Sequence, residues 1–330
     1  MTKEDATSTS LGFSPKVNPQ PPYPSLVYII KHFIFEVFWQ GGIWGTVLFA
    51  LLFPSYQRFY TFCTESYHIS APMFFCLMTS LSHTFCYAVF NLTFDYIDKH
   101  NILAKYKMER KPYQTPKPAL RKKLFVEAII GQLVTSPLTA YFLYPVFCHF
   151  GMLDFTAPHP TMQSLFFTFA TAHMFNDVGF YFAHRLAHSK PIYAKIHKQH
   201  HEFAGTIGFA AEYAHPIEQI VCNQLPTVGG VLFFGCHPLC VWIWIALRLQ
   251  QTYEAHSGYC FDGSILDRLG LSHAESSSFH DHHHTSNKGN FGITYMDYIF
   301  GTMDHYMVAG GHEGYVEKGR AAYAKKKKKK

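Results

Sequence analysis

The sequence predicts an all-α integral membrane protein, with about four transmembrane helices, a membrane hairpin and a cytosolic helical cap. Three observations support this prediction. Hydrophobic residues make up 48% of the 330 residues and charged residues only 15%, which is unusual for a soluble domain. Several apolar runs have the length of about 20 residues that a helix needs to cross a bilayer. Histidines gather in three short runs next to these apolar segments.

The predicted elements begin after residues 1–24, which are rich in Ser, Thr and Pro. We expect these residues to form a flexible cytosolic segment, because they contain too little apolar surface to fold. Residues 25–123 are expected to hold the first transmembrane helices and a basic cytosolic loop. Four apolar runs are expected to span the membrane as single helices: residues 32–53, 72–94, 124–150 and 161–183.

A fifth apolar region, residues 217–248, differs from the other four because helix breakers interrupt it. These breakers are Pro226, Gly229, Gly230 and Pro238. Such residues are tolerated at membrane depth where neighbouring helices satisfy the freed backbone groups. We therefore expect a hairpin of two helices or a re-entrant pair here.

The charge pattern predicts the orientation of these spans. The formal net charge is +6, but the last six residues are all lysine and supply this excess, so a nucleic-acid-binding protein is not indicated. The loop 99–123 carries nine Lys or Arg residues and one acid. Basic loops stay in the cytoplasm. If the spans alternate, residues 184–216 and everything after about residue 249 share this cytoplasmic side.

The first histidine run is "HRLAH", in which His184 and His188 stand four residues apart. On a helix that continues from the fourth span, both imidazoles project from one face and can bind one metal ion. Tyr181 and Asp177 lie earlier on the same face. A carboxylate there can accept the outer N–H of a ligating imidazole. The HExxH pattern of zinc proteases is excluded because Arg185 follows His184.

Two further runs, "HKQHH" and "HDHHH", share the pattern H-x-x-H-H. On a helix this spacing places the first, fourth and fifth residues on a common side. One zinc ion needs three or four ligands, so a larger set implies two metal ions. Imidazole suits zinc, copper, iron and nickel alike. The candidate ligands of the three runs are His184, His188, His197, His200, His201, His280, His283 and His284.

The three runs and their surroundings resemble the integral-membrane fatty acid hydroxylase/sterol desaturase superfamily. "NDVGFYFAHRLAH" is similar to the entry motif D-x-x-x-Y-x-x-H-R-x-x-H, and "AEYAHPIEQ", "HSGY", "GNFG" and "DYIFGT" are similar to the sterol branch. Within the superfamily, the resemblance is strongest to C4-methylsterol oxidases. It covers residues 124–304, which we take as the catalytic domain, and leaves residues 305–330 as a cytosolic tail.

The resemblance implies two non-haem irons, held by the histidine runs at the cytoplasmic face of the endoplasmic reticulum. These irons would activate dioxygen to oxidise a C–H bond of a membrane lipid, with electrons from NAD(P)H through cytochrome b5. His215 and His256 lie in motifs close to the site and are either ligands or hydrogen-bond partners, and His273 is a weaker candidate. Some side chains are expected to hydrogen-bond the ligating histidines without binding the metal themselves. They are Asp177, Tyr181, Glu212, Glu218, Asp281 and Asn290.

The C-terminus indicates where in the cell the protein resides. Lys327 and Lys328 stand at the fourth and third positions from the end, the spacing of a dilysine retrieval signal for the endoplasmic reticulum. A lysine run also binds anionic lipid head groups.

Three functions are compatible with these observations. The first is an iron-dependent methylsterol monooxygenase that removes a C4 methyl group by successive oxidations. The second is a hydroxylase or desaturase that acts on another sterol position, a fatty acyl chain or a sphingoid lipid. The third is a catalytically silent membrane scaffold that keeps the histidines for metal binding or folding.

Overall fold

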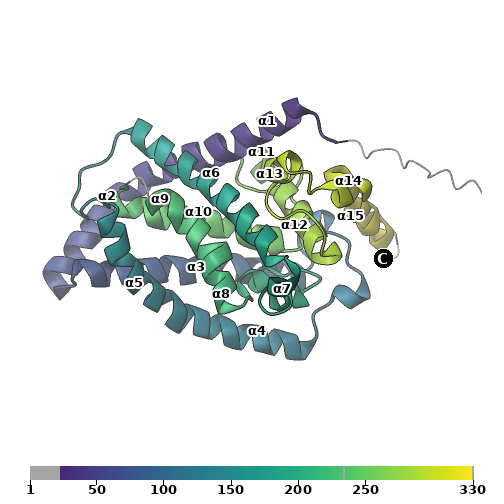
Figure 1. Cartoon of the computed structure of the whole chain (residues 1–330), viewed down its shortest axis with the longest axis horizontal. Coiled ribbons are helices and arrows are strands. Elements are labelled where there is room, and N and C mark those ends of the chain that lie inside the picture. The colour runs from purple at the N-terminus through teal and green to yellow at the C-terminus, as the bar shows by residue number, and fades with distance from the viewer. Residues whose placement is uncertain (1–22, 233–234, 329–330) are drawn as a thin grey trace, which may run out of the picture.

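The computed structural model describes residues 23–232 and 235–328, and within these ranges the chain is helical and contains no strand. The prediction of an all-α fold is therefore confirmed. The expected flexible segment, residues 1–24, lies almost entirely outside the described residues. Figure 1 shows the long helices running along the molecule and the shorter helices α12 to α15 gathered at one end.

The first long helix is continuous and consists of α1 (Leu26–Ile34), the π-helical segment η1 (Phe35–Ile43) and α2 (Trp44–Tyr67). It has 42 residues in all, and so extends beyond the predicted span 32–53 at both ends. The π-helical segment places Glu36 and Gln40 in the interior of the protein.

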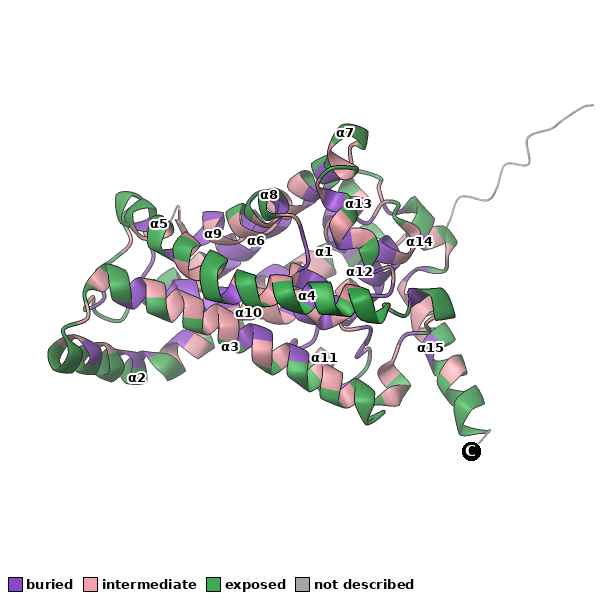
Figure 2. Ribbon diagram, turned by 90° about the horizontal axis from the view of Figure 1, so that it is seen from below, coloured by how far each residue is buried: buried purple, intermediate pink, exposed green. Residues whose placement is uncertain are grey.

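Two further long helical stretches follow. They comprise α3 (Ala71–Lys99), and then α4 (Pro118–Ile130), η4 (Gly131–Thr135) and α5 (Ser136–His149). By length and composition, three stretches of the described chain can cross a membrane: Leu26–Tyr67, Ala71–Lys99 and Pro112–His149. Only 22% and 17% of the most apolar windows of the second and third are buried. Their outward apolar side chains suit a lipid environment, and Figure 2 shows this exposure along α4.

The other predicted membrane segments are helical as well. The run 161–183 forms α6 (Met162–Ala187). The run 217–248 forms α8 (Pro216–Glu218), η7 (Gln219–Gln224), α9 (Leu225–Leu232) and α10 (Pro238–His256), with the break before Pro238. Within the described residues, α6 and these helices do not reach the length and hydropathy of the three stretches above. The number of spans therefore stays a prediction.

Helices α6, α9 and α10 form the centre of the molecule. Helix α9 packs directly on α6, because a Cβ atom at Gly230 would lie 2.4 Å from the Cα of Ala172. Phe49, Phe169 and Trp244 are fully buried in the main apolar core between α2, α6 and α10. This packing fixes the C-terminal end of α6, where the first histidine run lies.

The remaining helices of the described chain include α7 and α13, which contact α6. Their bounds are η2 (Ala104–Tyr106), η3 (Pro112–Gln114), α7 (Lys190–Tyr193), η5 (His197–Glu202), η6 (Gly208–Glu212), α11 (Ile265–Arg268), α12 (Ala274–Ser286), α13 (Thr294–Ile299), α14 (Asp304–Val308) and α15 (Gly311–Lys327). The basic loop contacts them through an ion pair between Arg110 and Asp281 and a hydrogen bond of 3.0 Å from Gln114 to Thr285. The basic loop and α12 therefore lie at the same end of the protein.

Candidate metal centre

Three separate elements bring the histidine runs together. The first run ends α6, the second forms the 3-10 helix η5, and the third lies in α12. A fourth element, α10, adds its last residue, His256. Nine imidazoles meet there in two clusters, which we name the first and the second histidine cluster.

The first histidine cluster consists of His184, His188, His197, His201 and His283. The Nε2 atom of His197 lies 3.1 Å from that of His184, 2.9 Å from that of His188 and 3.0 Å from that of His201. The Nε2 atom of His283 lies 3.1 Å from that of His188 and 3.2 Å from that of His201. All five rings thus turn the same nitrogen toward one point.

The second histidine cluster consists of His200, His256, His280 and His284. The Nε2 atom of His256 lies 3.4 Å from that of His200 and 2.9 Å from that of His280, and the Nε2 atoms of His280 and His284 are 3.1 Å apart. His256 is therefore as central to this cluster as any member of the three runs.

Neighbouring histidines in the sequence join different clusters. His200 belongs to the second cluster and His201 to the first, and His284 and His283 divide in the same way. Successive residues on a helix point about 100° apart, so one short helix can serve two centres. In the second and third runs, the first and fifth histidines share a cluster and the fourth joins the other cluster.

The outer nitrogens of several rings are held by acceptors. The Nδ1 atoms of His184 and His283 donate to the backbone carbonyls of Phe291 and Gly289, each at 2.6 Å. The Nδ1 atom of His256 donates to the carbonyl of Thr252 at 2.8 Å. A carbonyl only accepts, so these rings carry their proton on Nδ1 and keep the Nε2 lone pair directed into the cluster.

Asp297 anchors the loop that supplies two of these carbonyls. Its carboxylate accepts hydrogen bonds of 2.8 Å from the backbone N–H of Phe291 and from that of Gly292, and one of 2.6 Å from the hydroxyl of Thr302. Asp297 is fully buried. Asp297 lies in "DYIFGT", which contributes to the family resemblance, but it is not among the predicted site residues.

The electrostatics keep the clustered imidazoles neutral. Burial, reinforced by the neighbouring imidazoles, holds the pKa of His184 and of His283 well below its usual range. Burial also lowers the pKa of His197 and of His200 to about 4, and the pKa of His256 to about 3. Neutral rings with converging lone pairs repel one another unless a cation lies between them. The donor set therefore fits two metal ions bound by imidazole.

Only some of the residues expected to hydrogen-bond the outer nitrogens of the imidazoles do so. Glu218 does so, since its carboxylate accepts a hydrogen bond of 2.7 Å from the Nδ1 of His197. Asp177 does not accept from His184, whose Nδ1 donates to the carbonyl of Phe291. Two helical turns separate them, which is roughly 10 Å along the axis, and Asp177 instead accepts from Tyr295 at 3.0 Å. Tyr181 contacts Arg185 and Thr302.

Three other expected outer contacts are absent among the described residues. Glu212 accepts from Gln132 and Tyr253, and Asp281 pairs with Arg110. Asn290 donates a hydrogen bond of 3.0 Å to the carbonyl of Phe279. It therefore fixes the loop and not an imidazole ring. Within the described residues, none of the three touches an imidazole of either cluster.

The other two histidine candidates, His215 and His273, lie outside both clusters. His215 caps α8, where its Nδ1 accepts from the backbone N–H of Ile217 at 3.2 Å. His273 is buried, and its Nε2 lies 3.1 Å from the Oε1 of Gln250. A separate buried group, Glu36, His173 and Asp177, also brings potential ligand atoms within 4.8 Å of one another. Among the described residues, neither His215 nor His273 belongs to a group of converging potential ligand atoms.

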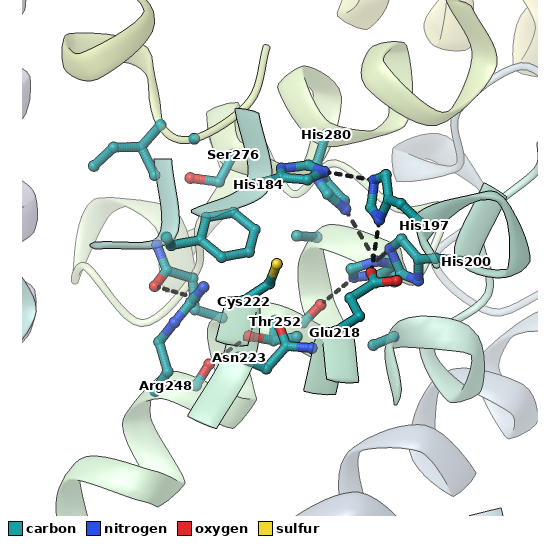
Figure 3. A pocket seen from close by; sticks show the side chains of 17 residues that line it. His184, His197, His200, Glu218, Cys222, Asn223, Arg248, Thr252, Ser276 and His280 are labelled. Atoms are coloured by element: carbon teal, nitrogen blue, oxygen red, sulfur yellow. Dashed lines mark hydrogen bonds and ion pairs between the residues drawn. The ribbon is translucent and has the colours of Figure 1, made fainter. Parts of the chain in front are cut away.

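A cavity opens beside the two clusters, with a free volume of about 630 Å³ including the part that is open to the outside. His184, His197, His200, His256 and His280 line one side of it, and Figure 3 shows Arg248 on the side away from His197 and His200. The remaining walls are mixed: Phe180, Ala211, Cys222, Ala255 and Ile293 are apolar, and Asn223, Gln251, Thr252 and Ser276 are polar. A molecule in this cavity would adjoin both clusters.

Comparisons with known proteins identify the family of this site. A family model described as fatty acid hydroxylase matches residues 169–302. Methylsterol monooxygenase 2-2 of Arabidopsis thaliana is 32% identical over 244 residues, which cover 72% of this chain and 89% of the relative. The chain belongs to the fatty acid hydroxylase family. The resemblance seen in the sequence is confirmed.

Other members of the fatty acid hydroxylase family are comparably similar. Methylsterol monooxygenase 2-1 of Arabidopsis thaliana is 30% identical over 254 residues, covering 72% of this chain and 92% of the relative. A very-long-chain aldehyde decarbonylase of Oryza sativa subsp. indica is 32% identical over 239 residues, covering 70% and 86%. No solved structure matches the chain. These relatives support an oxidoreductase that acts on lipids and associates with membranes.

Proposed function

We propose that this protein is a membrane-bound methylsterol monooxygenase that uses two non-haem irons to oxidise a C4 methyl group. The observation that carries the proposal is the convergence of nine Nε2 atoms in two clusters beside one cavity. The similarity to two methylsterol monooxygenases supports the sterol substrate. Each oxidation takes one O2, two electrons and two protons, inserts one oxygen atom into a C–H bond and releases one water.

The chain's own residues perform the binding and positioning. His184, His188, His197, His201 and His283 would hold one iron, and His200, His256, His280 and His284 the other. When bound, the irons supply the activation of dioxygen, which protein side chains do not provide. Glu218 and the carbonyls of Gly289 and Phe291 keep the ring tautomers fixed. Phe180 and Ile293 give the cavity apolar walls that exclude water from the reacting carbon.

The surroundings of the reaction are part of the proposal. Electrons come from NAD(P)H through cytochrome b5 or a similar donor. The protein resides in the endoplasmic reticulum membrane with the histidine clusters and the C-terminus in the cytosol. The basic loop supports this orientation, since Arg110 contacts α12 and basic loops face the cytoplasm. Lys327 and Lys328, at the exposed end of α15, are proposed as the retrieval signal.

A second function is favoured by one finding. The rice relative named as a very-long-chain aldehyde decarbonylase is as identical to this chain as the first Arabidopsis relative. The same histidine clusters would then oxidise a long acyl substrate. The protein would be a hydroxylase or desaturase of a fatty acyl or sphingoid lipid. A silent metal-binding scaffold is the remaining alternative.

The test is complementation of a host strain that lacks its own C4-methylsterol oxidase. We expect the wild-type chain to clear the accumulated 4-methylsterols, measured by gas chromatography and mass spectrometry. His283→Ala should abolish this activity, whereas His282→Ala should retain it. His282 is a neighbour in the same run, but its ring nitrogens contact Tyr315 and His305 rather than either cluster.

The outcome separates the candidates. If 4-methylsterols persist and a change in acyl or sphingoid lipids appears instead, the second function is correct. If the wild-type chain changes no lipid while binding metal, the scaffold alternative is correct. Equal loss of activity in His282→Ala and His283→Ala would contradict the assignment of the clusters.

A further inference from the structure

Arg248 is a cation in the wall of the cavity that adjoins the histidine clusters. It lies on α10, eight residues before His256, which is roughly 12 Å or two turns along the helix axis. Figure 3 shows it away from His197 and His200, with Cys222 and Thr252 between them. A molecule that fills the cavity thus has histidines at one side and a guanidinium at the other.

The guanidinium is fixed but incompletely bonded. Its Nε donates to the Oδ1 of Asn176 at 3.1 Å, and its Nη1 donates to the Oε1 of Gln251 at 2.9 Å. The group also lies 5.5 Å from the ring centroid of Phe180. A guanidinium has five N–H donors, so about three remain without an acceptor among the described residues. These donors are available to a ligand or to water.

The charge of Arg248 is not directly neutralised either. Within residues 23–232 and 235–328, no carboxylate forms an ion pair with it at 4.0 Å or less. The closest charged neighbours act only at longer range, namely Asp177 and Glu36. A structural arginine in a membrane protein usually pairs with a carboxylate or with several carbonyls. Arg248 instead keeps donors available at the cavity wall.

These observations identify the ligand by its chemistry. The free donors suit an oxygen acceptor, either a hydroxyl or a carboxylate. The opposite wall would hold the metal ions that oxidise carbon. A lipid bound by both walls therefore places its oxygen at the guanidinium and turns the carbon to be oxidised toward the histidines. A 4-methylsterol carries both groups, because its 3-hydroxyl lies on the carbon next to the one that bears the methyl group.

We propose that Arg248 binds the oxygen substituent of the lipid substrate and thereby presents the neighbouring carbon to the histidine clusters. The proposal rests on the proposed function for the choice of a sterol 3-hydroxyl. Asn176 and Gln251 are then positioning residues, since their side-chain oxygens accept from the guanidinium and fix it. This role makes Arg248 a determinant of which lipids are oxidised.

The test is equilibrium binding of two matched sterols to the iron-loaded protein in lipid nanodiscs. The probes are radiolabelled cholestanol, which has a 3-hydroxyl, and cholestane, which lacks it. We expect the wild type to prefer cholestanol by about tenfold or more, the usual size for a hydrogen bond to a charged group. Arg248→Met should bind both sterols equally, and Arg248→Lys should keep part of the preference. Arg268→Met, at an exposed position on α11, is the matched control and should behave as the wild type.

Several results would overturn the proposal. One is that the wild type does not prefer cholestanol over cholestane. The other is that Arg248→Met keeps this preference. A purely structural role for Arg248 would weaken binding of both sterols alike and leave their ratio unchanged, which also counts against the proposal.

A second pair, octadecan-1-ol and octadecane, distinguishes an acyl from a sterol substrate. A preference for octadecan-1-ol that depends on Arg248, without one for cholestanol, keeps the oxygen-binding role and overturns the sterol choice. Turnover of 4,4-dimethylsterol by the wild type is measured in parallel. Failure of that turnover, with an intact Arg248-dependent preference, contradicts the proposed function alone.

Discussion

Asp297→Asn is the substitution that separates the metal ligands from the loop that holds them. Asp297 touches neither histidine cluster, yet it fixes the loop whose carbonyls accept from His184 and His283. Asparagine has nearly the same shape but only one acceptor oxygen. One of the three hydrogen bonds must therefore be lost, and the other two lose their charge-assisted character.

The size of the effect follows from these contacts. The N–H of Gly292 loses its acceptor and faces an amide NH2, which costs about 1–3 kcal/mol for a buried group. The bonds from Phe291 and Thr302 weaken by about half, since charge-assisted bonds are roughly twice as strong as neutral ones. The sum is about 3 kcal/mol. Displacement of the carbonyls should also weaken metal binding by about 10- to 100-fold.

The assay combines iron content by elemental analysis with the melting temperature of the purified protein in nanodiscs. We expect Asp297→Asn to melt several degrees lower and to lose iron at chelator concentrations that the wild type withstands. Asp304→Asn, an exposed aspartate seven residues later, should match the wild type. Wild-type iron retention and melting in Asp297→Asn would refute the idea that this loop positions the rings.

Two more predictions follow from the site and its cap. His256→Ala should remove most of the metal of the second cluster and leave about half of the total, whereas His273→Ala should retain all of it; equal metal loss in the two variants would contradict the cluster assignment. Burial opposes ionisation of Glu275, but its contacts with His32 and Tyr28 outweigh burial and lower its pKa from 4.5 to about 2. A lowered pKa stabilises the fold above about pH 4.5 and this contribution, about 3 kcal/mol, is lost as the pH falls toward 2. Glu275→Gln should therefore melt lower at pH 6 and show a smaller further decrease on acidification, and a pH dependence identical to the wild type would count against this pairing.

The helical fold and the histidine runs were predictable because they depend on local patterns. Apolar runs of transmembrane length fix the long helices, and the four-residue spacing of His184 and His188 places both on one face of α6. The first long helix extends beyond both ends of the predicted span, because a helix can continue past its apolar run, here through Pro54 and Arg58 to Tyr67. Glu36 and Gln40 lie inside the predicted span and are accommodated in a π-helical segment. A polar residue in an apolar run marks no end when its side chain is buried among other helices.

The partition of the histidines between two clusters was not predictable from spacing. It depends on how the 3-10 helix η5 and helix α12 face each other, and this is set by contacts far apart in the sequence. His256 joins the second cluster because the end of α10 lies against α12, with Nε2 of His256 at 2.9 Å from that of His280. From its motif alone, His256 could be either a ligand or a hydrogen-bond partner.

The outer partners of the rings were the least predictable part of the site. Most are backbone carbonyls, such as those of Gly289, Phe291 and Thr252, and any residue type can supply a carbonyl. Carboxylates are the partners that a sequence can suggest. Of these, Glu218 contacts His197, whereas Asp177 lies two turns away from His184. The only sequence signal for the loop was its pair of glycines, of which Gly289 has a φ of 59°.

The most direct test of the account is the iron-to-protein ratio of the purified chain after anaerobic loading with ferrous iron, followed by O2 consumption in the presence of a reductant and a 4-methylsterol. Two histidine clusters predict a ratio near two, and O2 uptake that depends on the sterol. A folded protein that binds one iron or none, or that binds two and consumes no O2 with any lipid, would contradict the central claim that these nine imidazoles form an oxidising dimetal centre.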